Sequence, residues 1–169
     1  MAINTHEEIH NLVICVNIIV KRNDKFLMIR RSLEKKFLPG YVQPVGGKVE
    51  SNEDPLTAVK RELQEEANIT VKDVQLKAVV TEVKTSRDNI YQSNWQIFHF
   101  LGDYEKGSPS SSEEGELIWL TNKEIKQEKI SDSIKILLDD LVSPEKKVAF
   151  VKYTHGEENQ ILDTSITYA

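Results

Sequence analysis

The sequence has little cysteine and no long apolar run. Its one cysteine, Cys15, excludes an internal disulfide framework and a zinc site built from several cysteines. Because Cys15 lies inside an apolar stretch, we expect it to serve packing. The apolar runs are too short to span a membrane, and residues 1–11 lack a basic segment followed by an apolar one. These absences predict a cytoplasmic protein with no membrane partner.

Positive charge is also scarce, with 22 Lys and Arg against 27 Asp and Glu and a formal net charge of −5. A general nucleic-acid binder would present a basic face, so we expect no nucleic-acid partner. A phosphate-binding P-loop and a dinucleotide fingerprint are absent from the sequence as well. With 169 residues, 39% of them hydrophobic, the chain suits one core, and we expect a single domain over residues 1–169.

Three carboxylates dominate what the sequence does contain. Glu62, Glu65 and Glu66 have the spacing i, i+3, i+4, which places them on one side of an α-helix. Their mutual repulsion favours a hard divalent cation with oxygen ligands. The alternative is an ordinary acidic surface helix, since runs of charge are usually solvated.

The ends of this helix can be predicted from the residues that flank it. Asp54 is a good N-cap, Pro55 suits the first helical position, and Asn68 can adopt the left-handed conformation that ends a helix. The predicted helix therefore covers residues 55–67. Four residues at helical spacing are expected to face the core: Leu56, Val59, Leu63 and Ala67.

The remaining elements are predicted from apolar periodicity and turn residues. Strands are expected at residues 12–20, 26–30, 41–45, 74–84, 95–101, 116–120, 148–154 and 160–168. Helical segments are expected at residues 122–128 and 131–141, a polar turn at 85–93 and a loop at 103–113. This mixed order predicts an α/β fold, an α/β/α sandwich around a mixed β-sheet that ends in a C-terminal β-hairpin.

The whole pattern over residues 47–69 is more specific than the helix alone. It reads Gly47, five residues, Glu53, seven residues, Arg61-Glu62, the aliphatic Leu63, one residue, Glu65-Glu66, one residue, Asn68 and the aliphatic Ile69. This pattern resembles the Nudix box of the Nudix hydrolase superfamily, except at Asn68, where the family usually has Gly. The resemblance implies a Nudix-type sandwich and metal-assisted hydrolysis of a phosphoric anhydride, with Mg²⁺ as the cofactor and Mn²⁺ as a possible substitute.

The resemblance also implies roles for individual residues. The catalytic set is Glu62, Glu65 and Glu66, and the metal ligands are these three with the carbonyl of Gly47 and with Glu114. Glu53 and Arg61 form a supporting ion pair that fixes the loop to the helix. For Glu114 the alternative is a solvated acidic loop.

Within the superfamily the chain most resembles the MutT-like type that hydrolyses oxidised purine nucleoside triphosphates such as 8-oxo-dGTP. The implied substrate is then a small nucleotide, most simply a (d)NTP cleaved to the monophosphate and pyrophosphate. By position, Phe37, Gln43 and Asp132 would contact the base, although Asp132 also suits a helix N-terminus. Arg30 and Lys48 could neutralise phosphate oxygens, or they are solvated cations.

Other functions within the same fold stay open. The chain could hydrolyse ADP-ribose or a dinucleoside polyphosphate, or it could bind a nucleotide as a sensor without turnover. The proline expected downstream of the box in ADP-ribose pyrophosphatases is missing between Ile69 and Pro109. A complete set of three glutamates argues against a sensor, because binding alone does not require it. No pattern in the sequence indicates an oligomeric state.

Overall fold

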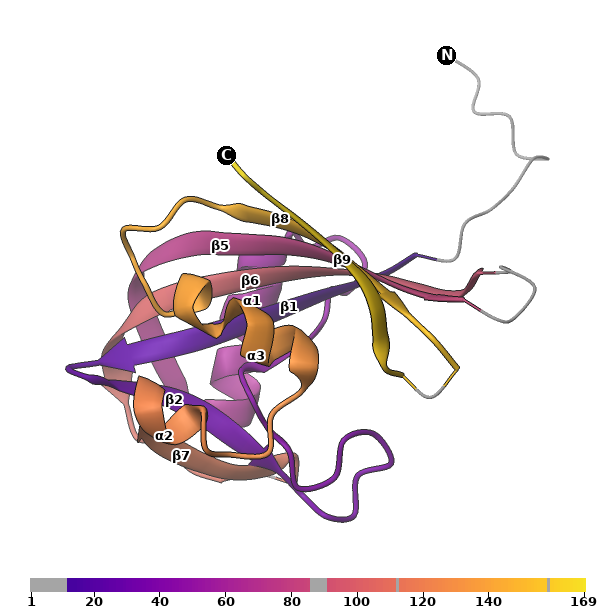
Figure 1. Cartoon of the computed structure of the whole chain (residues 1–169). Coiled ribbons are helices and arrows are strands. Elements are labelled where there is room, and N and C mark those ends of the chain that lie inside the picture. Colours follow the sequence, from indigo (N-terminus) through magenta and orange to yellow (C-terminus); the bar gives the residue numbers. More distant parts are fainter. Residues whose placement is uncertain (1–11, 86–90, 112, 158) are drawn as a thin grey trace.

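The computed structural model describes residues 12–85, 91–111, 113–157 and 159–169 (Figure 1). The middle of the turn predicted at 85–93 lies outside these residues. The described strands are β1 (Leu12–Arg22), β2 (Lys25–Arg31), β3 (Val42–Gln43), β4 (Val45–Lys48), β5 (Ile69–Thr85), β6 (Tyr91–Gly107), β7 (Gly115–Thr121), β8 (Ala149–His155) and β9 (Ile161–Tyr168). The described helices are α1 (Pro55–Ala67), α2 (Asn122–Ile125) and α3 (Asp132–Leu141).

The strands form one mixed sheet, as the order of elements predicted. Its main path runs β3-β2-β1-β6-β5-β8-β9, with β4 paired to β1 and β7 paired to β2. Two neighbouring pairs are parallel, β1 with β6 and β5 with β8, and the other pairs are antiparallel. Parallel neighbours need a connection that crosses the sheet, and the segments between them carry the helices.

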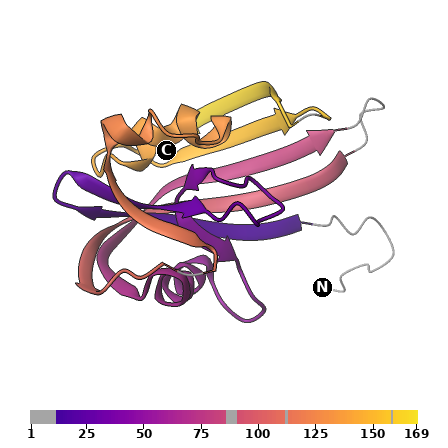
Figure 2. The same ribbon diagram turned by 90° about the horizontal axis from the view of Figure 1, so that it is seen from below.

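Helices cover both faces of the sheet, which confirms the predicted sandwich. Side chains alternate along β1, so that Val16 and Ile18 pack in a core with α1 while Ile19 packs in a second core with α3. In Figure 2 the magenta α1 lies on one side of the sheet, and the orange α2 and α3 lie on the other. The predicted inward stripe of α3, residues Ile134, Leu137, Leu138 and Leu141, is buried.

Two long strands extend beyond their predicted limits. β5 begins at Ile69 instead of Val74, and β6 continues to Gly107, so the loop predicted at 103–113 was wrong over its first half. The residues of this half are mostly polar, so they show no alternation of apolar and polar side chains. They nevertheless pair with β5, for example Asp103 with Lys72. The ends of the turn predicted at 85–93 are likewise strand, because Thr85 pairs with Tyr91.

The predicted C-terminal hairpin is confirmed. β8 and β9 are antiparallel, and Gly156 N–H donates to the Gln160 carbonyl at the turn (3.0 Å). β8 adds to the sheet beside β5, and β9 forms the outer edge (Figure 1). Within the described residues, no helix is both long enough and apolar enough to cross a membrane.

Candidate active site

Helix α1 carries the carboxylates, and its ends are those that the sequence predicted. The Asp54 carboxylate accepts hydrogen bonds from the backbone N–H groups of Leu56 (2.8 Å) and Thr57 (3.1 Å). At the other end, Asn68 adopts the left-handed conformation, with φ 52° and ψ 41°. These caps satisfy backbone groups that a helix leaves without partners. Packing of the apolar side chains against the sheet sets the rotation of the helix about its axis.

This rotation buries most of the predicted apolar stripe. Val59, Leu63 and Ala67 are buried, whereas Leu56, in the first turn, is 40% exposed and does not face the core as expected. Ala58 is fully buried near the same end of the helix. Beside the stripe, the exposure of the glutamates is graded: Glu62 is buried, Glu66 is half-buried and Glu65 is exposed.

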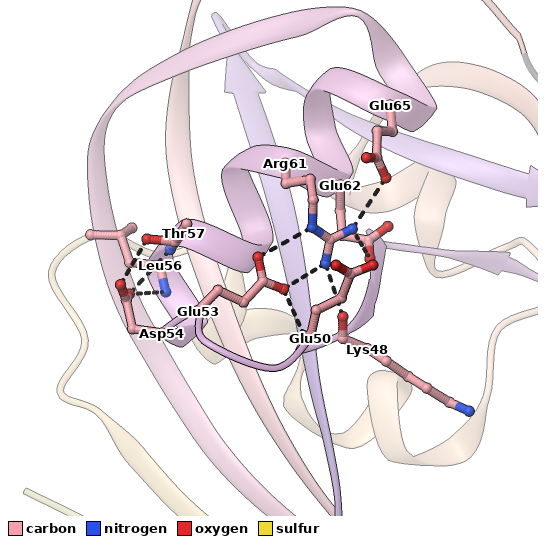
Figure 3. Close-up of polar contacts among 9 residues, drawn as sticks. All are labelled: Lys48, Glu50, Glu53, Asp54, Leu56, Thr57, Arg61, Glu62 and Glu65. Carbon is pink, nitrogen blue, oxygen red and sulfur yellow. Dashed lines mark hydrogen bonds and ion pairs between the residues drawn. The ribbon is translucent and has the colours of Figure 1, made fainter.

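Arg61 links the acids of the helix to the loop that precedes it (Figure 3). Its Nη2 donates to Glu53 Oε1 (2.7 Å), which is the ion pair that the family resemblance implies, and to the carbonyl of Lys48 (3.1 Å). Its Nη1 donates to Glu62 Oε1 (2.9 Å) and Glu65 Oε2 (3.1 Å). One guanidinium therefore pairs with three carboxylates and holds the loop on the helix, although its single positive charge cannot neutralise all three.

A cavity of about 330 Å³ opens beside α1 and is lined by acids from two parts of the chain. Its lining residues are Glu62, Glu65, Glu66, Glu113 and Glu114. The last two come from the segment before β7, more than forty residues after the helix. The structure thus places the predicted Glu114 beside the three helix glutamates, together with its neighbour Glu113.

Burial raises the pKa of two acids of this cavity, Glu62 and Glu66. The pKa of Glu66 is raised to about 7, chiefly by burial and then by the nearby Glu62 carboxylate, although Gly46 N–H donates to it. Burial also raises the pKa of Glu62, against the effect of Arg61. A cation placed among these acids would relieve both effects.

The donor set of the cavity suits a hard divalent cation, because every side-chain donor is a carboxylate oxygen. Because Gly47 has no side chain, the Glu62 carboxylate lies close to the backbone there; a Cβ at this position would overlap the carboxylate. In this state Glu62 and Glu65 share Arg61 Nη1, and Lys35 Nζ contacts Glu114 Oε1 (2.5 Å). Across the described residues, no three acid, His or Cys side chains converge as a ready-made metal site.

The two cations predicted to bind phosphate lie elsewhere. Arg30 makes a two-pronged pair with Glu128, through Nη1 (2.9 Å) and Nη2 (3.0 Å). Lys48 is exposed, and Figure 3 shows its side chain directed away from the carboxylates around Arg61. In the described part of the chain, Arg31 and Lys35 contact a lining residue of the cavity, Glu114, in addition to Arg61, which contacts Glu62 and Glu65.

Arg31 and Lys35 both approach Glu114. Lys35 forms the close pair described above, and Arg31 Nη1 lies 4.0 Å from Glu114 Oε2. The sequence held a signal for Arg31. Side chains alternate along β2, with Leu27 and Ile29 in the core under α1, so that the next residue on that face is Arg31 and not Arg30.

The three predicted base contacts come from segments that meet at one rim of the sheet. Phe37 is 67% exposed on the loop between β2 and β3, Gln43 is half-buried in β3, and Asp132 is exposed at the start of α3. Val42 N–H donates to the Lys129 carbonyl (2.8 Å), which ties β3 to the segment that leads into α3. Arg31 Nε donates to the Phe37 carbonyl (2.9 Å), which ties the loop to β2.

Comparison with known proteins agrees with this geometry. Residues 11–141, more than half of the chain, match the NUDIX domain. The chain is 38% identical over 104 residues to an uncharacterized Nudix hydrolase of Bacillus subtilis (strain 168), YvcI, in a match that spans 61% of this chain and 62% of that relative.

Solved structures extend the likeness to nearly the whole chain. The structure of a MutT protein from Bacillus halodurans superposes with a TM-score of 0.79 at 26% identity, covering 91% of this chain and 97% of that one. A MutT protein from Methanosarcina mazei Go1 shares the fold at 23% identity, with a TM-score of 0.63 over 78% of this chain and 94% of that one. Nudix hydrolases act on nucleoside diphosphate-linked substrates and generally use divalent metal ions. The chain belongs to the Nudix domain family and is a hydrolase.

Proposed function

We propose that this hydrolase cleaves a nucleoside triphosphate to the monophosphate and pyrophosphate, with Mg²⁺, or Mn²⁺ in its place, as the cofactor. Glu62, Glu65 and Glu66 form the catalytic set, and Glu114 and the Gly47 carbonyl complete the ligands of the cation. As expected from the sequence, we also propose that residues 1–169 form a single domain and that the protein is cytoplasmic.

The observation that carries the proposal is the cavity lined by five glutamates. Three of them come from one helix and two from a distant segment, so the fold brings together charges that repel each other. Such an arrangement costs free energy unless a cation offsets it. The raised pKa of Glu66, about 7, is the expected sign of this cost in the metal-free protein.

The chemistry follows from the donors. A bound divalent cation offsets charge on phosphate oxygens and lowers the pKa of water. The glutamates of this chain hold that cation, and one of the three helix glutamates takes the proton of the attacking water. Arg61 keeps Glu53 and Glu62 in place, because its guanidinium contacts Glu53 in the loop before α1 and Glu62 in α1 itself.

The substrate class rests on the MutT relatives and on the three residues expected to contact the base. The MutT protein of Bacillus halodurans matches 91% of this chain. Phe37, Gln43 and Asp132 then supply one apolar contact, one amide and one acid for a purine, with 8-oxo-dGTP as the first candidate. ADP-ribose and dinucleoside polyphosphates are the competing substrates.

A product-resolved screen tests the proposal. The purified chain is incubated with dGTP, 8-oxo-dGTP, the other triphosphates, ADP-ribose and dinucleoside polyphosphates in Mg²⁺, and the products are identified. We expect monophosphate and pyrophosphate from a triphosphate. We also expect Gln43→Ala or Asp132→Ala to lower kcat/KM about 5- to 150-fold, since each removes a hydrogen bond to the base. If ADP-ribose is the better substrate and both variants match the parent on triphosphates, the proposed base contacts are wrong.

A further inference from the structure

The end of β2 and the loop that follows it bring two cations to the acidic cavity. Lys35 Nζ lies 2.5 Å from Glu114 Oε1, and Arg31 Nη1 lies 4.0 Å from Glu114 Oε2. The Lys35 and Arg31 side chains are only 29% and 18% exposed, so this is not a pair of fully solvated charges. Glu114 is also a lining residue of the cavity, which means that both cations lie at its border.

A polyphosphate chain meets an electrostatic obstacle at this cavity. Five carboxylates line it, and an incoming triphosphate carries several more negative charges. Arg30 is paired with Glu128, and the Lys48 side chain leads away from the carboxylates around Arg61 (Figure 3). Among the described residues, contacts place three cations at the border of the cavity: Arg61, Arg31 and Lys35. Arg61 is already engaged by Glu53, Glu62 and Glu65, which leaves Arg31 and Lys35 as the cations on the Glu114 side.

The same loop is anchored to the strand that carries Arg31. Arg31 N–H donates to the Tyr41 carbonyl (2.9 Å), Gly40 N–H donates to the Arg31 carbonyl (3.1 Å), and Arg31 Nε donates to the Phe37 carbonyl (2.9 Å). Ser32 N–H donates to the Glu114 carbonyl (3.0 Å), which joins the loop to the segment that carries Glu114. Arg31 is thus held in place by the backbone around it, while Lys35 is attached to the cavity through its side-chain pair.

We propose that Arg31 and Lys35 bind the polyphosphate of the substrate, and that Lys35 releases Glu114 to the divalent cation when the polyphosphate enters. This inference rests on the proposed function and names the residues for the phosphate end of that site. Before binding, Lys35 acts as a counter-cation for Glu114. Afterwards, phosphate oxygens take the place of the carboxylate on Lys35, and Glu114 is available to the cation.

The exchange gives Lys35 opposite effects on two ligands. Without phosphate, Lys35 competes with a metal ion for Glu114, so removing its charge should tighten metal binding. With phosphate, Lys35 is a direct partner, so removing it should weaken anion binding. A lysine that only stabilises the loop would weaken both or change neither.

The test measures two affinities in the whole chain. Mn²⁺ binding alone is followed by electron paramagnetic resonance, and binding of inorganic tripolyphosphate in Mg²⁺ by calorimetry. The variants are Lys35→Ala, Lys35→Arg and, as a matched loss of one positive charge on the same loop, the exposed Lys36→Ala. We expect Lys35→Ala to bind tripolyphosphate about 10- to 100-fold more weakly and Mn²⁺ alone more tightly, by about 2- to 10-fold. Lys35→Arg should retain most of the tripolyphosphate affinity, and Lys36→Ala should change both affinities less than Lys35→Ala.

The outcomes separate this inference from the proposed function. If Lys35→Ala binds tripolyphosphate as Lys36→Ala does while the parent hydrolyses triphosphates, the phosphate role of Lys35 is wrong and the proposed function stands. If Lys35→Ala weakens Mn²⁺ binding or leaves it at the parent value, the exchange of Glu114 is wrong. If the parent neither binds tripolyphosphate nor hydrolyses any triphosphate, both the proposed function and this inference are wrong.

Discussion

Glu66 is a residue whose ionisation is opposed both by burial and by a neighbouring negative charge. Its pKa is raised to about 7 from 4.5, first by burial and then by Glu62. In the metal-free protein it therefore keeps a proton into neutral pH, whereas in the unfolded chain it loses that proton near its ordinary pKa. The stability that Glu66 contributes is present at low pH and is lost as pH rises from about 4.5 through 7.

We predict that Glu66→Gln makes the metal-free protein more stable above pH 7 than the parent, by about 1 to 3 kcal/mol, with little difference near pH 4.5. Urea unfolding in chelator at several pH values measures this. Glu65→Gln is the control, because Glu65 is exposed on the same helix. A parent and a Glu66→Gln protein with the same pH dependence would contradict the assignment of the raised pKa.

Gly47 is the residue that makes room for Glu62. We predict that Gly47→Ala displaces the Glu62 carboxylate, because the added Cβ would overlap it. The expected result is a kcat at least about 10-fold lower and weaker Mn²⁺ binding, since Glu62 is one of the proposed ligands. Kinetics and metal titration measure both, and the unfolding midpoint shows whether the fold is retained. Parent-like kcat and metal affinity would mean that Glu62 can move without consequence.

Side chains of the helix were easier to predict than those of the strands. The positions of Glu62, Glu65 and Glu66 relative to one another depend only on local spacing, and the structure places all three beside one cavity. Arg30 was predicted as a phosphate contact and Arg31 was not, because alternation along β2 does not by itself say which face of the strand lies under α1. That face is decided by packing against a helix that begins more than twenty residues later.

At the scale of elements, the ends of α1 were predictable because caps are local. Asn68 has φ 52°, and its side chain accepts a hydrogen bond from Gln64 Nε2 (2.9 Å). We predict that Asn68→Gly changes the free energy of unfolding by less than about 0.5 kcal/mol, because Gly tolerates this conformation. Asn68→Ala should cost about 1 to 2 kcal/mol. Urea denaturation of the two variants compares them directly, and equal stabilities would contradict the role given to the backbone conformation.

Strand lengths were less predictable than helix ends. β5 and β6 pair from Ile69 with Gly107 to Thr85 with Tyr91, including stretches of polar sequence and several register shifts. Pairing of this kind is fixed by the partner strand, so residues with no apolar alternation of their own still become strand. The apolar centres of both strands were found, and their polar ends were not.

At the scale of the whole molecule, the C-terminal hairpin completes the core that contains α3. Tyr153 of β8 is fully buried, and its hydroxyl donates to the Ser133 carbonyl in α3 (3.2 Å). The buried Asp140 of α3 accepts hydrogen bonds from Lys146 Nζ (2.8 Å) and the Tyr168 hydroxyl (3.2 Å). The hairpin is therefore joined to α3 by packing and by polar contacts.

We predict that Tyr153→Ala lowers the free energy of unfolding by about 3 to 5 kcal/mol, as expected for a large buried aromatic side chain. Phe150→Ala, on the same strand, is the control, because Phe150 is 47% exposed and should cost much less. Chemical denaturation measures both. Similar losses in the two variants would mean that β8 does not bury its Tyr153 face against α3.

The sequence predicted the fold class but not the order of the strands. The parallel pairs β1 with β6 and β5 with β8 join segments far apart in the chain, and no local pattern specifies such partners. The antiparallel pair of β2 with β7 is also non-local, and it positions Glu114, which lies beside the helix glutamates and contacts Lys35. Family resemblance supplied the first of these contacts, and the second became visible only in the structure.

The most direct test of the central proposal is the release of pyrophosphate and monophosphate from dGTP and 8-oxo-dGTP as Mg²⁺ is varied. The parent should require the cation and should stop in excess chelator. Glu65→Gln and Glu66→Gln should lower kcat by about 100- to 10,000-fold while remaining folded. Undiminished turnover by either variant in excess chelator would contradict the proposed metal-dependent role of these carboxylates.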